Sequence, residues 1–110
     1  MREIIIGDKE YKVVASPITL FFYKKEFKTD LLGDYMKLQE LETNVGAFDG
    51  VSILQMAWAM VKTAKAGQIV DFEQWLNGLE YVNFEDDRMM AEIIEEATQG
   101  FFRSREQTPK

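Results

Sequence analysis

The carboxylates between positions 85 and 96 are the side chains whose type and spacing could best support chemistry. Glu92 and Glu96 lie one helical turn apart, where two carboxylates could bind a divalent cation or act as an acid–base pair. Helix surfaces carry such residues by default, however, and the glutamates lie opposite Ile93 and Ile94, where a solvated face is expected. We therefore interpret them as a charged helix face, with a carboxylate-metal enzyme as the weaker alternative.

Other catalytic and cofactor-binding arrangements are excluded by the composition. The 110 residues contain no cysteine, which removes disulfides, thiolate metal sites and cysteine nucleophiles. They contain no histidine, which removes the Ser-His-Asp arrangement and histidine zinc sites. The glycines show no phosphate-binding spacing. We expect a protein that is not an enzyme and has no catalytic residue, no metal and no cofactor.

The charge pattern indicates protein partners more than nucleic acid. A formal net charge of −6 argues against general nucleic-acid binding, because phosphate backbones repel an acidic chain. The densest basic group, Lys24, Lys25 and Lys28, is too small to change this expectation. Nine acidic residues and one base lie between positions 71 and 96, so this stretch could steer a basic partner.

The apolar segments are too short for membrane insertion or export. The N-terminal apolar run, 4–6, has three residues and a Gly-Asp turn follows it, so it does not resemble a signal peptide. The longest apolar stretch, 53–61, is interrupted by Gln55 and has about half of the roughly 20 residues that a membrane span needs. We expect a soluble cytoplasmic protein with no membrane partner.

The residue pattern predicts a mainly α fold, with an N-terminal β-hairpin followed by about five helices in a small bundle. Residues 3–6 and 11–14 are rich in β-branched side chains and flank a polar loop with a glycine, which is typical of a hairpin. We expect one helical domain over 1–102, with the hairpin at about 3–15 and a flexible polar tail at 103–110.

The first predicted helix follows the hairpin directly. Ser16 is a suitable N-cap and Pro17 fits the first helical position, so a helix is expected at about 17–27. Ile18, Phe21 and Phe22 follow the 3–4 spacing of residues on one side of a helix, so we expect them to form its buried stripe.

Four more helices follow. Thr29 or Asp30 caps the second, which runs through Leu31 to Leu41. A loop at 43–50 separates it from a third helix at roughly 50–66 that Gly67 ends. This third helix is apolar on nearly every side, which predicts burial in the middle of the bundle or by partner chains. Asp71 caps a fourth helix, and Asn83 caps a fifth at about 84–99, which Gly100 ends.

Candidate partner-binding residues follow from side-chain type. Methionines suit adaptable binding surfaces, although their helical spacing favours a role in the core. Two adjacent phenylalanines after the last helix must either fold back or meet another chain. With the glutamates of the acidic face, the candidates are Met56, Met60, Phe101, Phe102, Glu92, Glu95 and Glu96.

Three segments carry a resemblance to a known family. They are Tyr-Lys-Lys-Glu-Phe at 23–27 with Asp-Leu-Leu at 30–32, Leu-Gln-Met-Ala-Trp-Ala-Met at the start of 54–66, and Asp-Phe-Glu-Gln-Trp-Leu at 71–76. With the opening hairpin, and in this order, they resemble the tail assembly chaperones of long-tailed bacteriophages and prophages over about residues 3–100. Lys28 departs from the family pattern, in which glycine often follows the phenylalanine.

The resemblance implies a function without catalysis. Such chaperones bind the phage tape measure protein in the bacterial host cytoplasm, keep it soluble, help to recruit the tail tube protein and are absent from the finished virion. We also expect self-association, as a homo-oligomer or an open array along one long partner. The alternative is a small acidic regulatory or toxin-neutralising module that binds proteins.

Overall fold

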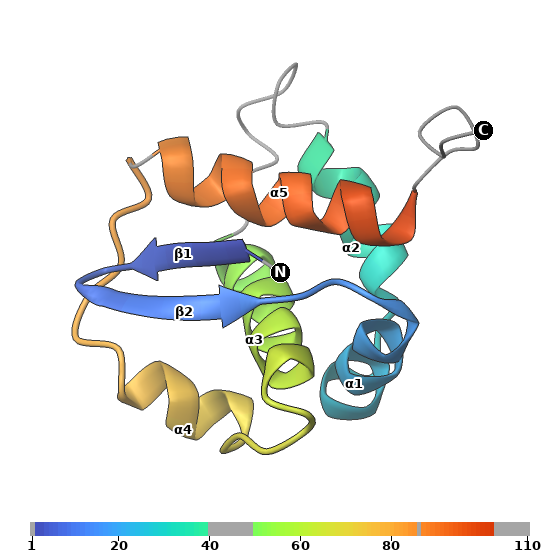
Figure 1. Cartoon of the computed structure of the whole chain (residues 1–110), viewed down its shortest axis with the longest axis horizontal. Coiled ribbons are helices and arrows are strands. Elements are labelled where there is room, and N and C mark those ends of the chain that lie inside the picture. The colour runs from blue at the N-terminus through green and yellow to red at the C-terminus, as the bar shows by residue number, and fades with distance from the viewer. Residues whose placement is uncertain (1, 40–49, 86, 103–110) are drawn as a thin grey trace.

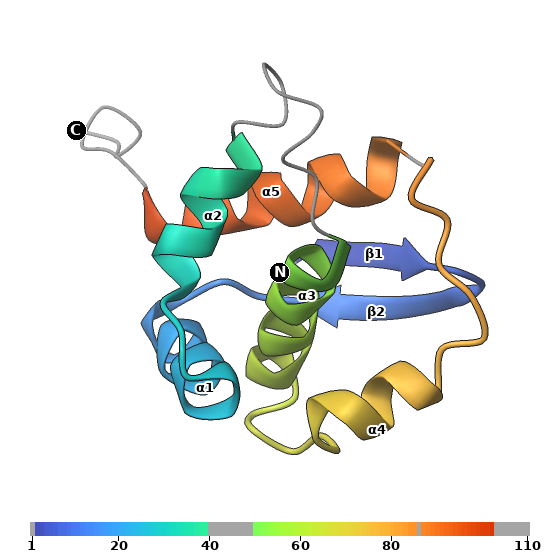
Figure 2. The same cartoon turned by 180° about the vertical axis from the view of Figure 1, so that it is seen from behind.

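The computed structural model describes residues 2–39, 50–85 and 87–102 and confirms the predicted fold class (Figures 1 and 2). A two-stranded antiparallel hairpin is followed by five helices. The predicted tail at 103–110 and most of the predicted loop at 43–50 lie outside the described residues. The elements are β1 (Arg2–Ile6), β2 (Lys9–Val13), α1 (Pro17–Phe27), α2 (Leu31–Gln39), α3 (Gly50–Ala64), α4 (Phe72–Asn77) and α5 (Asp87–Phe101).

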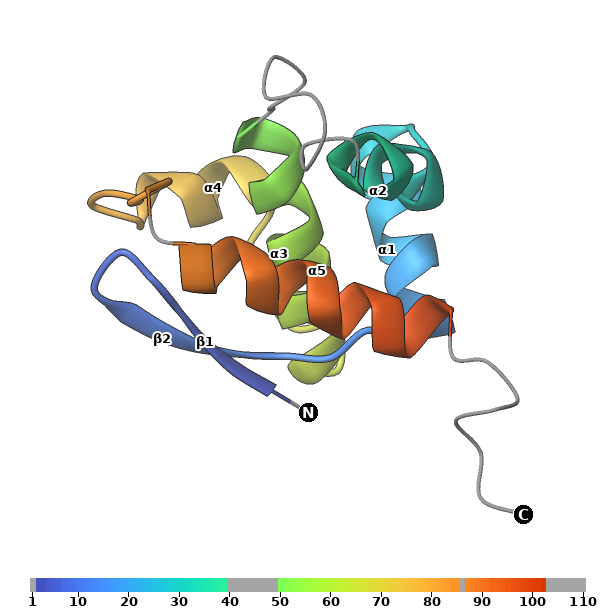
Figure 3. The same ribbon diagram turned by 90° about the horizontal axis from the view of Figure 1, so that it is seen from above.

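Helix α3 is the centre around which the other elements pack. The hairpin lies on one side of α3, and α1 and α2 lie on the opposite side (Figure 3). Strand β2 contacts α3, and α5 runs alongside β1 (Figure 1). Helix α4 packs against α3 below the hairpin in the same view. This arrangement explains why the third helix needs apolar residues on nearly every side.

The hairpin presents alternate residues to the core. Ile4 pairs with Tyr11 across the strands, and Ile4, Ile6 and Val13 are buried, whereas Ile5 is about half exposed. Gly7 has a positive φ of 65°, which favours glycine, and a Cβ at this position would lie 2.2 Å from the carbonyl oxygen of Tyr81. Turn geometry and a neighbouring backbone therefore both require glycine here.

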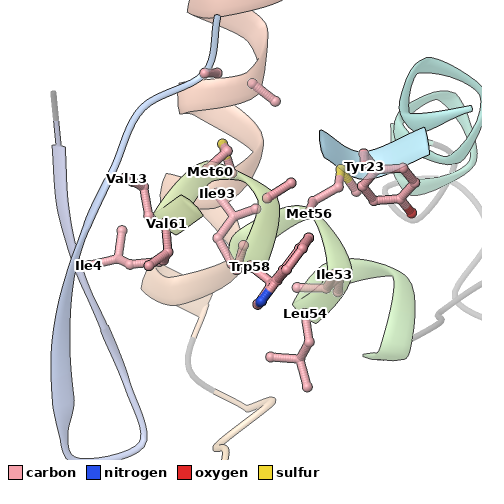
Figure 4. Packing of buried hydrophobic residues seen from close by; sticks show 14 of the residues in the cluster. Ile4, Val13, Tyr23, Ile53, Leu54, Met56, Trp58, Met60, Val61 and Ile93 are labelled. Atoms are coloured by element: carbon pink, nitrogen blue, oxygen red, sulfur yellow. The ribbon is translucent and has the colours of Figure 1, made fainter. Parts of the chain in front are cut away.

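The interior is built mainly on α3, as predicted. Trp58 has no exposed surface, and its indole N–H donates a hydrogen bond to the carbonyl oxygen of Val70 at 3.0 Å. The core cluster around it joins the hairpin, α1 and α5 (Figure 4). The buried run on α3 comprises Ile53, Leu54, Met56, Ala57, Trp58, Ala59, Met60 and Val61.

The predicted limits of the fifth helix are wrong at both ends. Asn83 accepts a hydrogen bond from the backbone N–H of Glu85 at 3.0 Å, so it forms a local turn, and residues 84 and 85 lie outside the helix, which is described as Asp87–Phe101. At the other end, α5 continues through Gly100 to Phe101. A Cβ at Gly100 would lie 2.2 Å from the Ala15 carbonyl oxygen, so this glycine permits close packing and does not stop the helix.

The buried face of α1 also differs from the prediction. Thr19 and Tyr23 point inward, whereas Ile18 and Phe21 are 47% and 57% exposed. The inward hydroxyls have partners: Thr19 Oγ1 lies 2.6 Å from Thr63 Oγ1, and the Tyr23 hydroxyl donates to the Asp34 carboxylate at 2.6 Å. Because these polar groups are satisfied, their burial is tolerated, and the more apolar face remains outside.

Candidate functional site

The predicted partner-binding methionines belong to the core. Met56 and Met60 have no exposed surface, and both lie on α3 among the residues that join the hairpin, α1 and α5 (Figure 4). Their assignment to a binding surface is therefore corrected: they fill irregular space in the interior, the other role that methionine has at helical spacing.

Glu96 is the second correction, because it does not lie on a solvated helix face. Its carboxylate accepts a hydrogen bond from the backbone N–H of Ala15 at 3.2 Å and another from Arg2 Nε at 3.1 Å. Only 10% of the Glu96 side chain is exposed. The carboxylate therefore holds the start of β1 and the end of the hairpin against α5.

Arg2 is the charge partner that makes this burial possible. Its guanidinium also forms an ion pair with Glu95 at 3.0 Å, and Glu95 is well exposed. Desolvation opposes the charge on Arg2, but hydrogen bonds and charge interactions with Glu96 and Glu95 outweigh it and raise its pKa. Glu96 therefore anchors the N-terminal strand, and Glu95 adds an exposed ion pair to the same guanidinium.

Glu92 lies apart from this ion-pair cluster. It is half-buried and lines a hollow of about 320 Å³ between α5 and the outer face of the hairpin. Glu92 and Glu96 are thus directed to different surroundings, and the two do not form one carboxylate site. Among the described residues, no three acidic side chains are grouped as a possible metal site.

The two adjacent phenylalanines fold back on the domain. Phe101 is half-buried and packs against the core. Phe102 stacks on Tyr35 of α2, with ring centroids 5.0 Å apart, but remains 42% exposed. The Tyr35 hydroxyl in turn forms a hydrogen bond with Thr98 on α5. Of the predicted partner-binding residues, Phe102 thus combines a structural contact with an accessible apolar surface.

An accessible apolar surface lies on α1, over residues that the sequence pattern assigned in part to the core. We call it the α1 face: a hollow of about 560 Å³ whose lining residues are Pro17, Leu20, Phe21, Lys24, Lys25 and Asp30. Ile18 extends the exposed apolar area along the same helix. The signal for this face is that apolar residues lie on several sides of 17–27, so that one side of the helix cannot bury them all.

Comparison of the chain with models of protein families found no match, and searches of curated proteins and of solved structures found none either. Across the ranges 2–39, 50–85 and 87–102, no helix combines the length and apolar character that a membrane crossing requires. Function is therefore inferred from the residue pattern and from the surfaces described above.

Proposed function

We propose that this protein is a tail assembly chaperone of a long-tailed bacteriophage or prophage. It binds the tape measure protein in the bacterial host cytoplasm, keeps it soluble and helps to recruit the tail tube protein. It acts by binding and carries out no reaction. The observation that carries the proposal is the α1 face, an accessible apolar surface on a chain with a net charge of −6.

This combination suits a protein that keeps another chain soluble. An accessible apolar surface can cover the apolar side chains of a client, and such a surface is a usual mark of a protein-binding site. The net negative charge makes complexes repel one another and opposes their aggregation. One surface thus binds the client while the remaining charge keeps the complex in solution.

The three segments that resemble the family meet at one place in the fold. The Phe27 ring, from the first segment, packs edge-to-face on Trp58, from the second, with centroids 5.5 Å apart. It packs in the same way on Phe72, from the third, at 4.9 Å. Glu26 accepts a hydrogen bond from the Phe72 backbone N–H at 3.2 Å. The segments form one packing unit, which gives a physical reason for finding them together.

Self-association is part of the proposal, because a long client offers many equivalent binding positions to copies of one chain. A homo-oligomer or an open array of copies would cover such a client. Size-exclusion chromatography with light scattering measures this directly, with a mass that rises with protein concentration as the expected result. A strict monomer at high concentration would contradict self-association.

Co-expression tests the function itself. The chain is produced together with the long helical protein encoded beside it, and the soluble fraction of that partner is measured. An unrelated acidic protein of similar size serves as the control for non-specific effects of charge. We expect the soluble fraction of the partner to rise markedly when it is produced with this chain and not when it is produced with the control protein. An unchanged soluble fraction would contradict the chaperone function and favour a smaller regulatory or toxin-neutralising partner.

A further inference from the structure

We propose that the α1 face is the docking site for an acidic amphipathic helix of the client. The inference rests on the proposed chaperone function and deepens it, because it names the surface that binds and the chemistry of what is bound. Three features of the described residues carry it. The floor of the face is apolar and exposed, its basic end has no ion-pair partners, and its backbone groups are not available to form hydrogen bonds with an extended peptide.

The floor of the face is apolar and accessible. Phe21 is 57% exposed and Ile18 is 47% exposed, and Leu20 and Pro17 lie beside them on the same helix. A volume of about 560 Å³ falls within the usual range of roughly 300–1,000 Å³ for ligand-binding hollows. Several apolar side chains of a partner could therefore be buried here at once.

The C-terminal end of the face is basic. Lys24 and Lys25 line the hollow, and Lys28 follows at the end of α1. Among the described residues, none of these three lysines forms an ion pair with a carboxylate. The nearby Asp30 accepts a hydrogen bond from the Leu32 backbone N–H at 3.1 Å, so its carboxylate is engaged at the start of α2. In a chain of net charge −6, this end is complementary to a negative partner.

The chemistry of the floor selects a helical occupant. The α1 face consists of side chains on a helix, whose backbone groups bond within that helix, so it offers no strand edge for β-pairing. A peptide buried on an apolar floor must satisfy its own backbone hydrogen bonds. A helix does so, and one with apolar residues at i, i+3, i+4 and i+7 places them all on one side.

Two peptides of about 18 residues test the inference, a length sufficient for a helix to form on binding. Both carry leucine at i, i+3, i+4 and i+7; one has glutamate at the flanking positions and the other has lysine. Binding to the full chain is measured by fluorescence anisotropy at low and high salt. We expect the glutamate peptide to bind on the order of tenfold more tightly than the lysine peptide, with the difference reduced at high salt.

Matched variants locate the binding surface. Phe21→Ser removes the most exposed large apolar side chain of the floor, and the double variant K24E/K25E reverses the charge at the basic end. Val70→Ser, at a half-exposed apolar position, and Lys65→Glu, at an exposed basic position, are the controls. We expect the first two changes to weaken binding of the glutamate peptide on the order of tenfold, while the controls retain it. Circular dichroism confirms that each variant remains folded.

Four outcomes would overturn the inference. The first is equal binding of the two peptides, and the second is binding of the glutamate peptide by Phe21→Ser and K24E/K25E that equals binding by the wild type. The third is binding of the wild type to anionic lipid vesicles in place of the peptide. The fourth is loss of self-association as the main effect of Phe21→Ser. The last two would assign the face to a membrane or to a second copy of the chain.

Co-expression separates this inference from the proposed function. If the wild type, Phe21→Ser and K24E/K25E all solubilise the long client, the chaperone function stands and the α1 face is not its docking site. If the wild type does not solubilise the client, the proposed function fails. Loss of client solubilisation in these two variants, with the Val70→Ser and Lys65→Glu controls active, supports both.

Discussion

Glu96 accepts a hydrogen bond from the backbone N–H of Ala15 at 3.2 Å, a contact that joins positions 81 residues apart in the sequence. Ala15 lies where the chain leaves the hairpin and enters α1, and Glu96 lies on α5. The same carboxylate accepts from Arg2 at the start of β1. One buried side chain thus ties the hairpin to the last helix, and its charge is balanced by a guanidinium.

Replacement of Glu96 should therefore reduce stability strongly. Glu96→Ala leaves the Ala15 N–H and the Arg2 guanidinium without this acceptor, and we expect a loss of about 2–4 kcal/mol in the free energy of unfolding. Urea denaturation followed by circular dichroism measures it. Glu95→Gln is the control, because this exposed ion pair contributes about 0–1 kcal/mol. Equal effects of the two changes would contradict the anchoring role of Glu96.

Gly100 and Gly33 provide a matched pair of helical glycines. A Cβ at Gly100 would lie 2.2 Å from the Ala15 carbonyl oxygen, so Gly100→Ala should destabilise by about 1–3 kcal/mol although alanine favours helix. Among the described residues, and apart from its chain neighbours and the nearby backbone of its own helix, nothing lies within 4 Å of a Cβ built at Gly33, so Gly33→Ala should stabilise by about 0.5–1 kcal/mol. Thermal unfolding measures both. A stabilising Gly100→Ala would show that α5 does not approach Ala15 closely.

Met56 and Met36 test the division between core and surface methionines. Met56 has no exposed surface, so Met56→Gln buries an amide among apolar side chains and should lower the free energy of unfolding by about 2–4 kcal/mol. Met36 is 58% exposed on α2, and Met36→Gln should change stability by no more than about 0.5 kcal/mol. Chemical denaturation compares the two variants. A neutral Met56→Gln would contradict its place in the core.

Tyr11 should make stability depend on alkaline pH. Burial, and then the negative charge of Asp8, raise the pKa of Tyr11 above its ordinary value of 10.0, because both disfavour the phenolate. The unfolded chain therefore releases this proton at a lower pH than the folded chain. The stabilising effect is fully present below pH 10.0 and declines as the pH rises through the raised pKa.

The variant Tyr11→Phe isolates this contribution. Its stability relative to the wild type should stay constant from neutral pH to just below 10.0 and should then increase as the wild type loses its advantage. Urea denaturation over this pH range gives the difference. A difference that does not change above pH 10.0 would show that the phenol is equally ionisable in the folded and unfolded chains.

Features set by neighbouring residues could be predicted from the sequence. The start of α1 follows from Pro17 at its first turn, and Asp71 caps α4 by accepting a hydrogen bond from the Gln74 N–H at 2.8 Å. Each signal acts within a few residues and needs no distant partner. The buried side of α1 could not be predicted in this way. Thr19 can face the interior because its hydroxyl forms a hydrogen bond with Thr63 of α3, which is distant in the sequence.

The sequence by itself determined the mainly helical class, the hairpin, the need to cover the third helix on nearly every side and the exclusion of cysteine and histidine chemistry. These depend on composition, local capping and apolar periodicity. Only the tertiary structure decided that Glu96 is buried, that Gly100 continues a helix and that Phe21 faces outward. Each of these features depends on Ala15, Arg2 or α3, which are distant in sequence from the residue concerned. The pattern along one segment cannot specify which distant residue will bond to a buried polar group, or which one will lie so close that only glycine fits.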